Sequence, residues 1–222
     1  MPHSQHKPVS TPPIRTLADL LAADDARDRA TCGVSLQGPE QTRLAELGAH
    51  DPTPTSYFVL EQLFAHFRFG ASSHLLDVGC GTGRVLAHFL HEGCPGHATG
   101  IELDPRLAAQ AHTWARHHPN LTVIQGSALE ADLSPYTDFY LFNPFNPNVL
   151  QQFIEALERQ VAHACTVVHM SDNGDTWRYL GRPGWTEVAS GRIQHWRNER
   201  GYPIEVYEDP QHYTVWRYDP TA

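Results

Sequence analysis

The feature that most constrains the fold is a regular alternation of short apolar runs and helical segments between residues 74 and 170. The apolar runs have the length of β-strands and occupy residues 74–79, 97–103, 121–126, 138–143 and 165–170. Segments with helical periodicity fill three of the four gaps between them, at residues 83–93, 104–118 and 147–162. Such alternation requires a parallel sheet covered by helices on both faces. The sequence therefore predicts a doubly wound, mostly parallel α/β domain.

The flanking segments follow other patterns. Proline and serine dominate residues 1–13, which we expect to form a disordered tail. Residues 14–70 contain two predicted helices, one capped by Thr16 with Leu17, Leu20 and Leu21 on one face, and one that includes Phe58 to Phe67. This N-terminal helical segment precedes a domain predicted over residues 71–222.

The end of the chain is aromatic and partly alternating in hydropathy. Residues 185–198 and 204–219 are long enough for two strands, which we expect to form an antiparallel hairpin at one edge of the sheet.

Charge and cysteine usage limit the classes of partner. Sixteen basic against 25 acidic residues give a net charge of −9, which disfavours a broad nucleic-acid-binding face. A local basic patch stays open, because Arg182, Arg192, Arg197 and Arg200 lie close together in the sequence. The four cysteines form no CxxC pair, and the 15 histidines are spread along the chain, so no metal site is expected. With no secretory signal and no apolar run near membrane-spanning length, we expect a cytoplasmic protein without membrane association.

Three glycines at alternate positions, Gly79, Gly81 and Gly83, follow the first predicted strand. Ligands of doubly wound sheets bind at this strand-to-helix turn, where glycines let a ligand approach the backbone. A phosphate loop needs a lysine, and Lys7 is the only one in the chain. A dinucleotide fingerprint needs a third glycine where this chain has Arg84 or Leu86. Both of these binding modes therefore fit poorly.

The remaining pattern is D-x-G-x-G-x-G, starting at Asp77, and it resembles the first motif of class I S-adenosylmethionine (SAM) dependent methyltransferases. A carboxylate at the tip of the second strand, here Glu102, can accept hydrogen bonds from both hydroxyls of a ribose. The resemblance implies a Rossmann-like sheet and SAM as the cofactor, with adenine contacts from Ser127 and Ala128. The cofactor-binding candidates are Thr55, Tyr57, Asp77, Gly79, Cys80, Gly81, Gly83, Glu102, Leu103, Ser127, Ala128 and Asn143.

The fourth strand runs into a second motif formed by Asn143, Pro144 and Phe145. Asn-Pro is also ordinary turn chemistry. In class I methyltransferases, however, a [DN]PP[FY] tetrad at this position marks enzymes that methylate amino groups, although this chain has a single proline there. The resemblance makes these three residues the catalytic candidates, with Asn143 Oδ1 and a nearby carbonyl accepting the hydrogens of an amine. For a hydroxyl acceptor, His169 or Asp172 would serve as a general base.

Further segments, such as residues 27–38 and 50–63, resemble a group of bacterial methyltransferases. The glycine loop and the segment before it are also similar to non-SET histone-lysine methyltransferases. In those relatives the preceding segment closes over the cofactor, which suggests Thr55 and Tyr57 for that role. The expected activity is methyl transfer from SAM, with nitrogen on a small molecule or protein side chain as the favoured acceptor. An O-methyltransferase, a non-catalytic SAM-sensing module and, less well supported, a dinucleotide oxidoreductase stay open.

Overall fold

The computed structural model describes residues 13–38, 41–198 and 200–222. The predicted tail at residues 1–13 lies outside the described residues apart from Pro13, and the proposed domain boundaries stay predictions. Seven strands form one sheet in the order β3-β2-β1-β4-β5-β9-β6. Their bounds are β1 His74–Val78, β2 His97–Glu102, β3 Leu121–Gln125, β4 Asp138–Phe142, β5 Cys165–Ser171, β6 Trp185–Ile193 and β9 Gln211–Tyr218. The first five pair in parallel, and β9 runs antiparallel to both of its neighbours. The predicted doubly wound, Rossmann-like sheet is confirmed.

Three helices connect the parallel strands where the periodicity predicts them: α3 Arg84–His91, α4 Pro105–Ala115 and α5 Pro147–Gln160. Two of them begin with local sequence signals. The side chain of Asp104 caps α4 by accepting from the backbone N–H of Arg106, and Asn146 caps α5, in each case followed by a proline at the first helical position. These caps explain why each helix begins where its sequence pattern starts.

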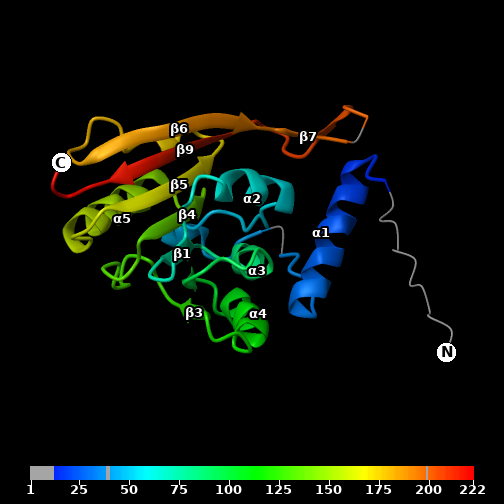
Figure 1. Cartoon of the computed structure of the whole chain (residues 1–222), viewed down its shortest axis with the longest axis horizontal. Helices are drawn as coiled ribbons and strands as arrows, with labels where there is room; N and C mark the ends of the chain where they lie inside the picture. Colours follow the sequence, from blue (N-terminus) through cyan, green and yellow to red (C-terminus); the bar gives the residue numbers. More distant parts are fainter. Residues whose placement is uncertain (1–12, 39–40, 199) are drawn as a thin grey trace.

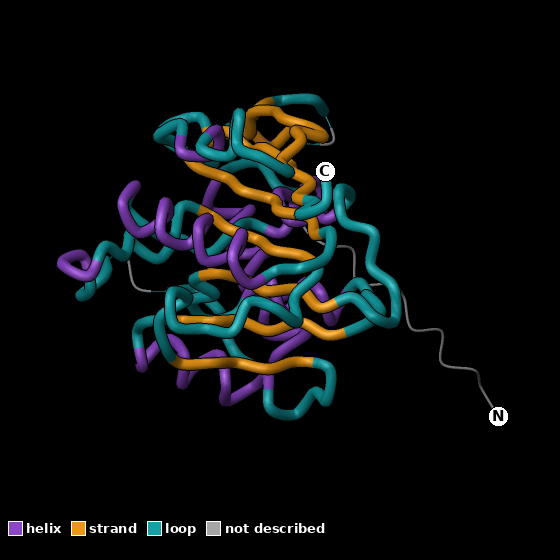
Figure 2. The backbone as a smooth tube through the Cα atoms, turned by 90° about the vertical axis from the view of Figure 1, so that its left-hand side faces the viewer, coloured by secondary structure: helices purple, strands orange, loops and turns teal. Residues whose placement is uncertain are grey.

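The sheet separates two hydrophobic clusters, because successive side chains of a strand point to opposite faces. Leu75 and Tyr140 point to the face covered by α2 (Tyr57–Phe64), α3 and α4, whereas Leu76 and Phe139 point to the face covered by α5. Figure 1 shows these helices around the strands, and Figure 2 shows the strands stacked between helical layers.

The first helix, α1 Leu17–Cys32, carries the predicted Thr16 cap as a reciprocal capping box with Asp19. The apolar face expected for this helix is wrong in part, because Leu20 is buried whereas Leu17 and Leu21 are exposed. The other buried positions are Asp24 and Asp28, one and two turns further along. Helix α1 therefore presents carboxylates to the rest of the molecule.

The C-terminal hairpin is confirmed, but each of its predicted strands is interrupted. Strands β6 and β9 belong to the main sheet, whereas β7 His195–Arg197 and β8 Pro203–Glu205 form a separate two-stranded sheet at the tip of the hairpin. Pro210, which has no N–H to donate to a ladder, lies directly before β9. The tip extends beyond the main sheet toward α1 (Figure 1).

Candidate active site

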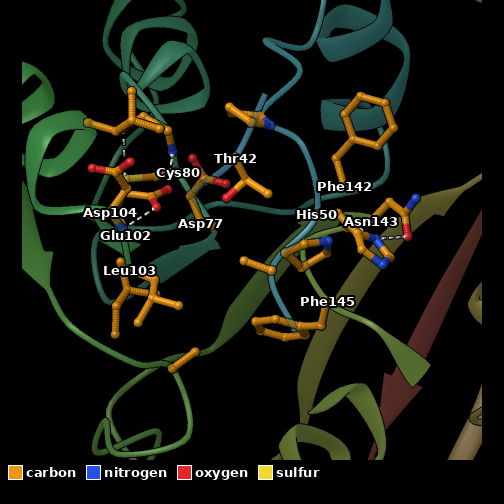
Figure 3. A pocket seen from close by; sticks show the side chains of 18 of the residues that line it. Thr42, His50, Asp77, Cys80, Glu102, Leu103, Asp104, Phe142, Asn143 and Phe145 are labelled. Carbon is orange, nitrogen blue, oxygen red and sulfur yellow. Dashed lines mark hydrogen bonds between the residues drawn. The ribbon is translucent and has the colours of Figure 1, made fainter. Parts of the chain in front are cut away.

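A cleft opens at the carboxyl ends of β1, β2 and β4, the position at which doubly wound sheets bind ligands. Its walls come from the glycine loop after β1, the loops after β2, β3 and β4, and the segment of residues 42–55 that precedes α2. Figure 3 shows the carboxylates of Glu102 and Asp104 on one side of the cleft, His50 and Asn143 on the other, and Asp77 between them.

The three loop glycines all adopt left-handed backbone conformations, with φ of 77° at Gly79, 55° at Gly81 and 95° at Gly83. A Cβ at Gly79 would lie 2.9 Å from Pro144 Cβ, and one at Gly83 would lie 2.9 Å from an atom of the Trp114 ring on α4. A Cβ at Gly81 would meet nothing within 4 Å. Two glycines thus permit close packing, and the middle one leaves bare backbone on the cleft.

Glu102 and Asp77 place two buried carboxylates beside this loop. Glu102 accepts the backbone N–H of Gly81 through Oε2 at 2.8 Å and that of Asp104 through Oε1 at 2.8 Å. Burial raises the pKa of Glu102, although these two donors oppose the shift. Asp77 is 2% exposed, and its Oδ2 has no hydrogen-bond partner within the described residues. Burial, and then the charge of Glu102, raise the pKa of Asp77 well above its ordinary value. A cationic ligand group would stabilise the ionised form.

At the other end of the cleft, Asn143 is the one described non-glycine residue with positive φ, at 41°. Its backbone N–H donates to the carbonyl of Met170, and its Nδ2 donates to Asp172 Oδ1 at 3.1 Å. His50 Nδ1 lies 2.9 Å from the backbone oxygen of Asn143 and 3.0 Å from its Oδ1. Asn143 therefore has an oriented side-chain amide in a strained backbone conformation, a combination typical of functional sites.

The segment before α2 is held against this loop by backbone contacts. The N–H of His50 donates to the carbonyl of Pro144 at 3.2 Å, and the N–H of Asn146 donates to the carbonyl of Gly48 at 2.7 Å. Ala49 forms an isolated antiparallel bridge with Phe145. Thr55 Oγ1 lies 3.1 Å from the hydroxyl of Tyr140 on β4. The segment thus covers one side of the cleft.

The structure brings most of the residues predicted from the sequence to the cleft. They are Thr55, Asp77, Gly79, Cys80, Gly81, Glu102, Leu103, Ser127, Ala128, Asn143, Pro144 and Phe145. Gly83 packs against α4 instead, and the buried hydroxyl of Tyr57 donates to Asp28 on α1 at 2.8 Å, outside the cleft lining.

The two residues suggested as general bases have different surroundings. His169 is buried in the core with its Nδ1 3.2 Å from the hydroxyl of Tyr179, and burial lowers its pKa to about 4. It does not line the cleft, so its suggested role as a base is not supported. Asp172 contacts Asn143 but is itself exposed. His50 was missed by sequence reasoning, because it lies 93 positions from Asn143 and in no recognisable motif.

The fold and the position of the cleft are similar to those of known methyltransferases. Residues 75–167 match the family model described as a methyltransferase domain, and this match together with the shared fold supports a SAM-dependent methyltransferase. No curated protein matches the sequence.

Several solved structures share the fold. An RNA methyltransferase from Salinibacter ruber, in complex with S-adenosyl-L-homocysteine, is 24% identical with a TM-score of 0.53, over 75% of this chain and 93% of that one. Precorrin 8w decarboxylase from Methanobacterium thermoautotrophicum is 19% identical with a TM-score of 0.55, over 74% and 91%. TrmN from Thermus thermophilus is 12% identical with a TM-score of 0.57, over 75% and 50%.

The cleft has the chemistry that SAM would require as the cofactor. SAM carries a cationic ammonium and sulfonium as well as a ribose. The unpartnered Oδ2 of Asp77 fits a cationic group, and Glu102 retains lone pairs for hydroxyl donors. Cys80 is not a nucleophile here, because burial raises the pKa of its thiol well above the ordinary value.

Within the described ranges, no group of three or more His, Cys, Asp or Glu side chains is arranged to hold a metal ion. No helix in the same part of the chain is long and apolar enough to cross a membrane.

Proposed function

We propose that the protein transfers the methyl group of SAM to a nitrogen atom of a small molecule or a protein side chain. The observation that carries the proposal is Asn143, whose side-chain amide lines the cleft and is oriented by hydrogen bonds with His50 and Asp172. An oriented carbonyl oxygen can accept a hydrogen of an amine and direct its lone pair toward the methyl group.

In this proposal the cofactor is held by the glycine loop and the loops after β2 and β3. Glu102 binds the ribose, Leu103, Ser127 and Ala128 surround the adenine, and Asp77 faces the cationic end. SAM supplies an activated methyl group with its own leaving group, so the chain contributes mainly positioning and exclusion of water. Phe145 supplies an aromatic surface for a flat or cationic acceptor.

A nucleic-acid acceptor is the second candidate, because one structural neighbour is an RNA methyltransferase. The net charge of −9 counts against it. Arg182, one member of the local basic cluster, is held in a bidentate pair with Glu158. A hydroxyl acceptor and a SAM-binding module without turnover are the remaining alternatives.

The test combines cofactor binding with product identification. Calorimetry should give a dissociation constant for SAM well below about 1 mM, because 1 mM corresponds to only about 4 kcal/mol of binding free energy. A lysate incubated with the protein and [methyl-³H]SAM should then yield labelled N-methyl products by mass spectrometry. Binding without any labelled product would favour the sensing module, and label confined to RNA or to oxygen would favour those acceptors.

A further inference from the structure

The contacts of His50 determine which of its ring nitrogens carries a proton. Nδ1 lies 2.9 Å from the backbone oxygen of Asn143, and a carbonyl oxygen only accepts hydrogen bonds. Nδ1 is therefore the donor, and it shares its hydrogen with Asn143 Oδ1 at 3.0 Å. In a neutral imidazole with a proton on Nδ1, the other nitrogen, Nε2, has a free lone pair.

The position of His50 makes this lone pair relevant to catalysis. His50 lines the cleft next to Asn143, and it is the one histidine among the described lining residues. Its Nε2 has no hydrogen-bond partner in the described part of the chain and is not sealed inside the protein.

The nearby carboxylates are already engaged. Asp172 accepts from Asn143 Nδ2, and Asp51 accepts the backbone N–H of Thr42. Among the described residues at this end of the cleft, the Nε2 atom of His50 is therefore the nitrogen positioned to accept a proton.

We propose that His50 is a catalytic general base, an inference that rests on the proposed methyl transfer to nitrogen. An aliphatic amine in water is mostly an ammonium ion, whose nitrogen has no lone pair to attack with. Nε2 takes one proton from this ammonium, leaving a neutral amine and an imidazolium. The amine lone pair then forms the new N–C bond while the C–S bond breaks, and the bonding electron pair stays on the departing sulfur. The imidazolium returns its proton to water.

The contact with Asn143 gives His50 a second, separable role, because the same Nδ1–H orients the Asn143 amide. An asparagine at position 50 places an N–H donor close to the position of Nδ1 but supplies no base. A loss of rate in His50→Asn therefore reports proton transfer, and any further loss in His50→Ala reports positioning. His112→Asn, on the exposed surface of α4, is the matched control.

The first measurement needs no acceptor. A long-range ¹H–¹⁵N correlation spectrum of the full-length protein should show His50 as the Nδ1–H tautomer, with Nε2 unprotonated when the ring is neutral. Asn143→Ala should reduce this preference. An Nε2–H tautomer in the wild-type protein would overturn the proposal.

The second measurement is the rate of tritium transfer from [methyl-³H]SAM into a lysate, together with SAM affinity by calorimetry. General base catalysis typically contributes about 10²–10⁴-fold. We expect His50→Asn and His50→Ala to lose about 100-fold or more in rate while SAM affinity stays within about twofold, and 50 mM or so of added imidazole to restore part of the rate of His50→Ala. If His50→Asn transfers the label at the wild-type rate, the role of His50 as a base is overturned, whereas the proposed methyl transfer is not. Absence of transfer by the wild-type protein overturns the proposed function and the base with it.

Discussion

A fully buried ion pair joins the N-terminal segment to the helix that follows the glycine loop. Asp28 on α1 accepts from Arg84, the first residue of α3, through Nε at 3.1 Å and Nη2 at 2.7 Å. Asp28 also accepts the backbone N–H of Leu36 at 3.1 Å and the hydroxyl of Tyr57 at 2.8 Å. Asp28 and Arg84 are 0% and 3% exposed, so neither charge is hydrated when the other is removed.

The variant Asp28→Ala leaves the Arg84 guanidinium buried with only Asp24, whose Oδ2 is 3.8 Å away. Removal of one partner from a buried pair costs about 3–5 kcal/mol. For a chain of this length, about 2–4 °C of Tm is lost per kcal/mol, so the predicted decrease is roughly 6–20 °C. Thermal unfolding followed by circular dichroism measures it.

The same helix supplies the control. Arg29 forms an exposed pair with Asp25 at 2.8 Å, one turn apart. Pairs of this kind contribute about 0.3–0.5 kcal/mol, so Arg29→Ala should change Tm by no more than about 2 °C.

A double variant tests the cause of the loss. Asp28→Leu with Arg84→Met removes both charges and should recover part of the stability, because no buried guanidinium is left without its bidentate partner. If Asp28→Ala loses no more than Arg29→Ala, or if the double variant is as unstable as the single one, the reasoning is refuted.

Three further predictions concern the cleft and the core. Gly81→Val should abolish calorimetric SAM binding while circular dichroism stays native, because φ is 55° at this position and the side chain would enter the cleft; retained binding would contradict the assignment of the loop. Burial raises the pKa of Asp77 above its ordinary 3.8, so the folded protein binds more protons than the unfolded chain and loses stability as pH rises. Asp77→Asn should therefore raise Tm at pH 7 but not at pH 4, and should weaken SAM binding; an equal Tm gain at both pH values would exclude this linkage. Burial lowers the pKa of His169 from 6.5 to about 4, so the unfolded chain takes up a proton first as pH falls through this window and stability is lost. Urea unfolding of His169→Leu should show a smaller loss between pH 6.5 and 4 than the wild type, and parallel curves would contradict this.

Periodicity predicted the sheet and its connecting helices because burial on one or two faces leaves a regular mark in the sequence. The same reasoning failed for α1, whose buried face carries Asp24 and Asp28. A periodicity argument counts carboxylates as solvent-facing, and their burial here depends on Arg84, which lies 56 positions from Asp28. It also joined β6 with β7 and β8 with β9, because local hydropathy does not show where a hairpin leaves the main sheet.

The residues of the candidate site also differ in whether local sequence or distant partners reveal their role. The glycine loop and Glu102 were recognisable because their residue types and spacing form a motif that can be read along the chain, although their contacts reach Pro144 and Trp114. The covering segment and His50 were not, since their function depends on pairing with Asn143 far along the chain. Gly48 illustrates the difference. A Cβ at this position would lie 2.7 Å from atoms of Asn146 and Val149, so a glycine is needed because of residues about 100 positions away.

By itself the sequence determined the α/β architecture and indicated SAM as the methyl donor, because both inferences depend on short-range patterns of burial and backbone freedom. Only the tertiary structure decided that His50 lines the cleft and that Tyr57 lies outside it. The tertiary structure also decided how the amide of Asn143 is oriented. Those outcomes depend on hydrogen bonds between residues far apart in the chain. A single sequence does not show such pairs, because the partner of a polar side chain is chosen by the folded geometry and not by its neighbours in sequence.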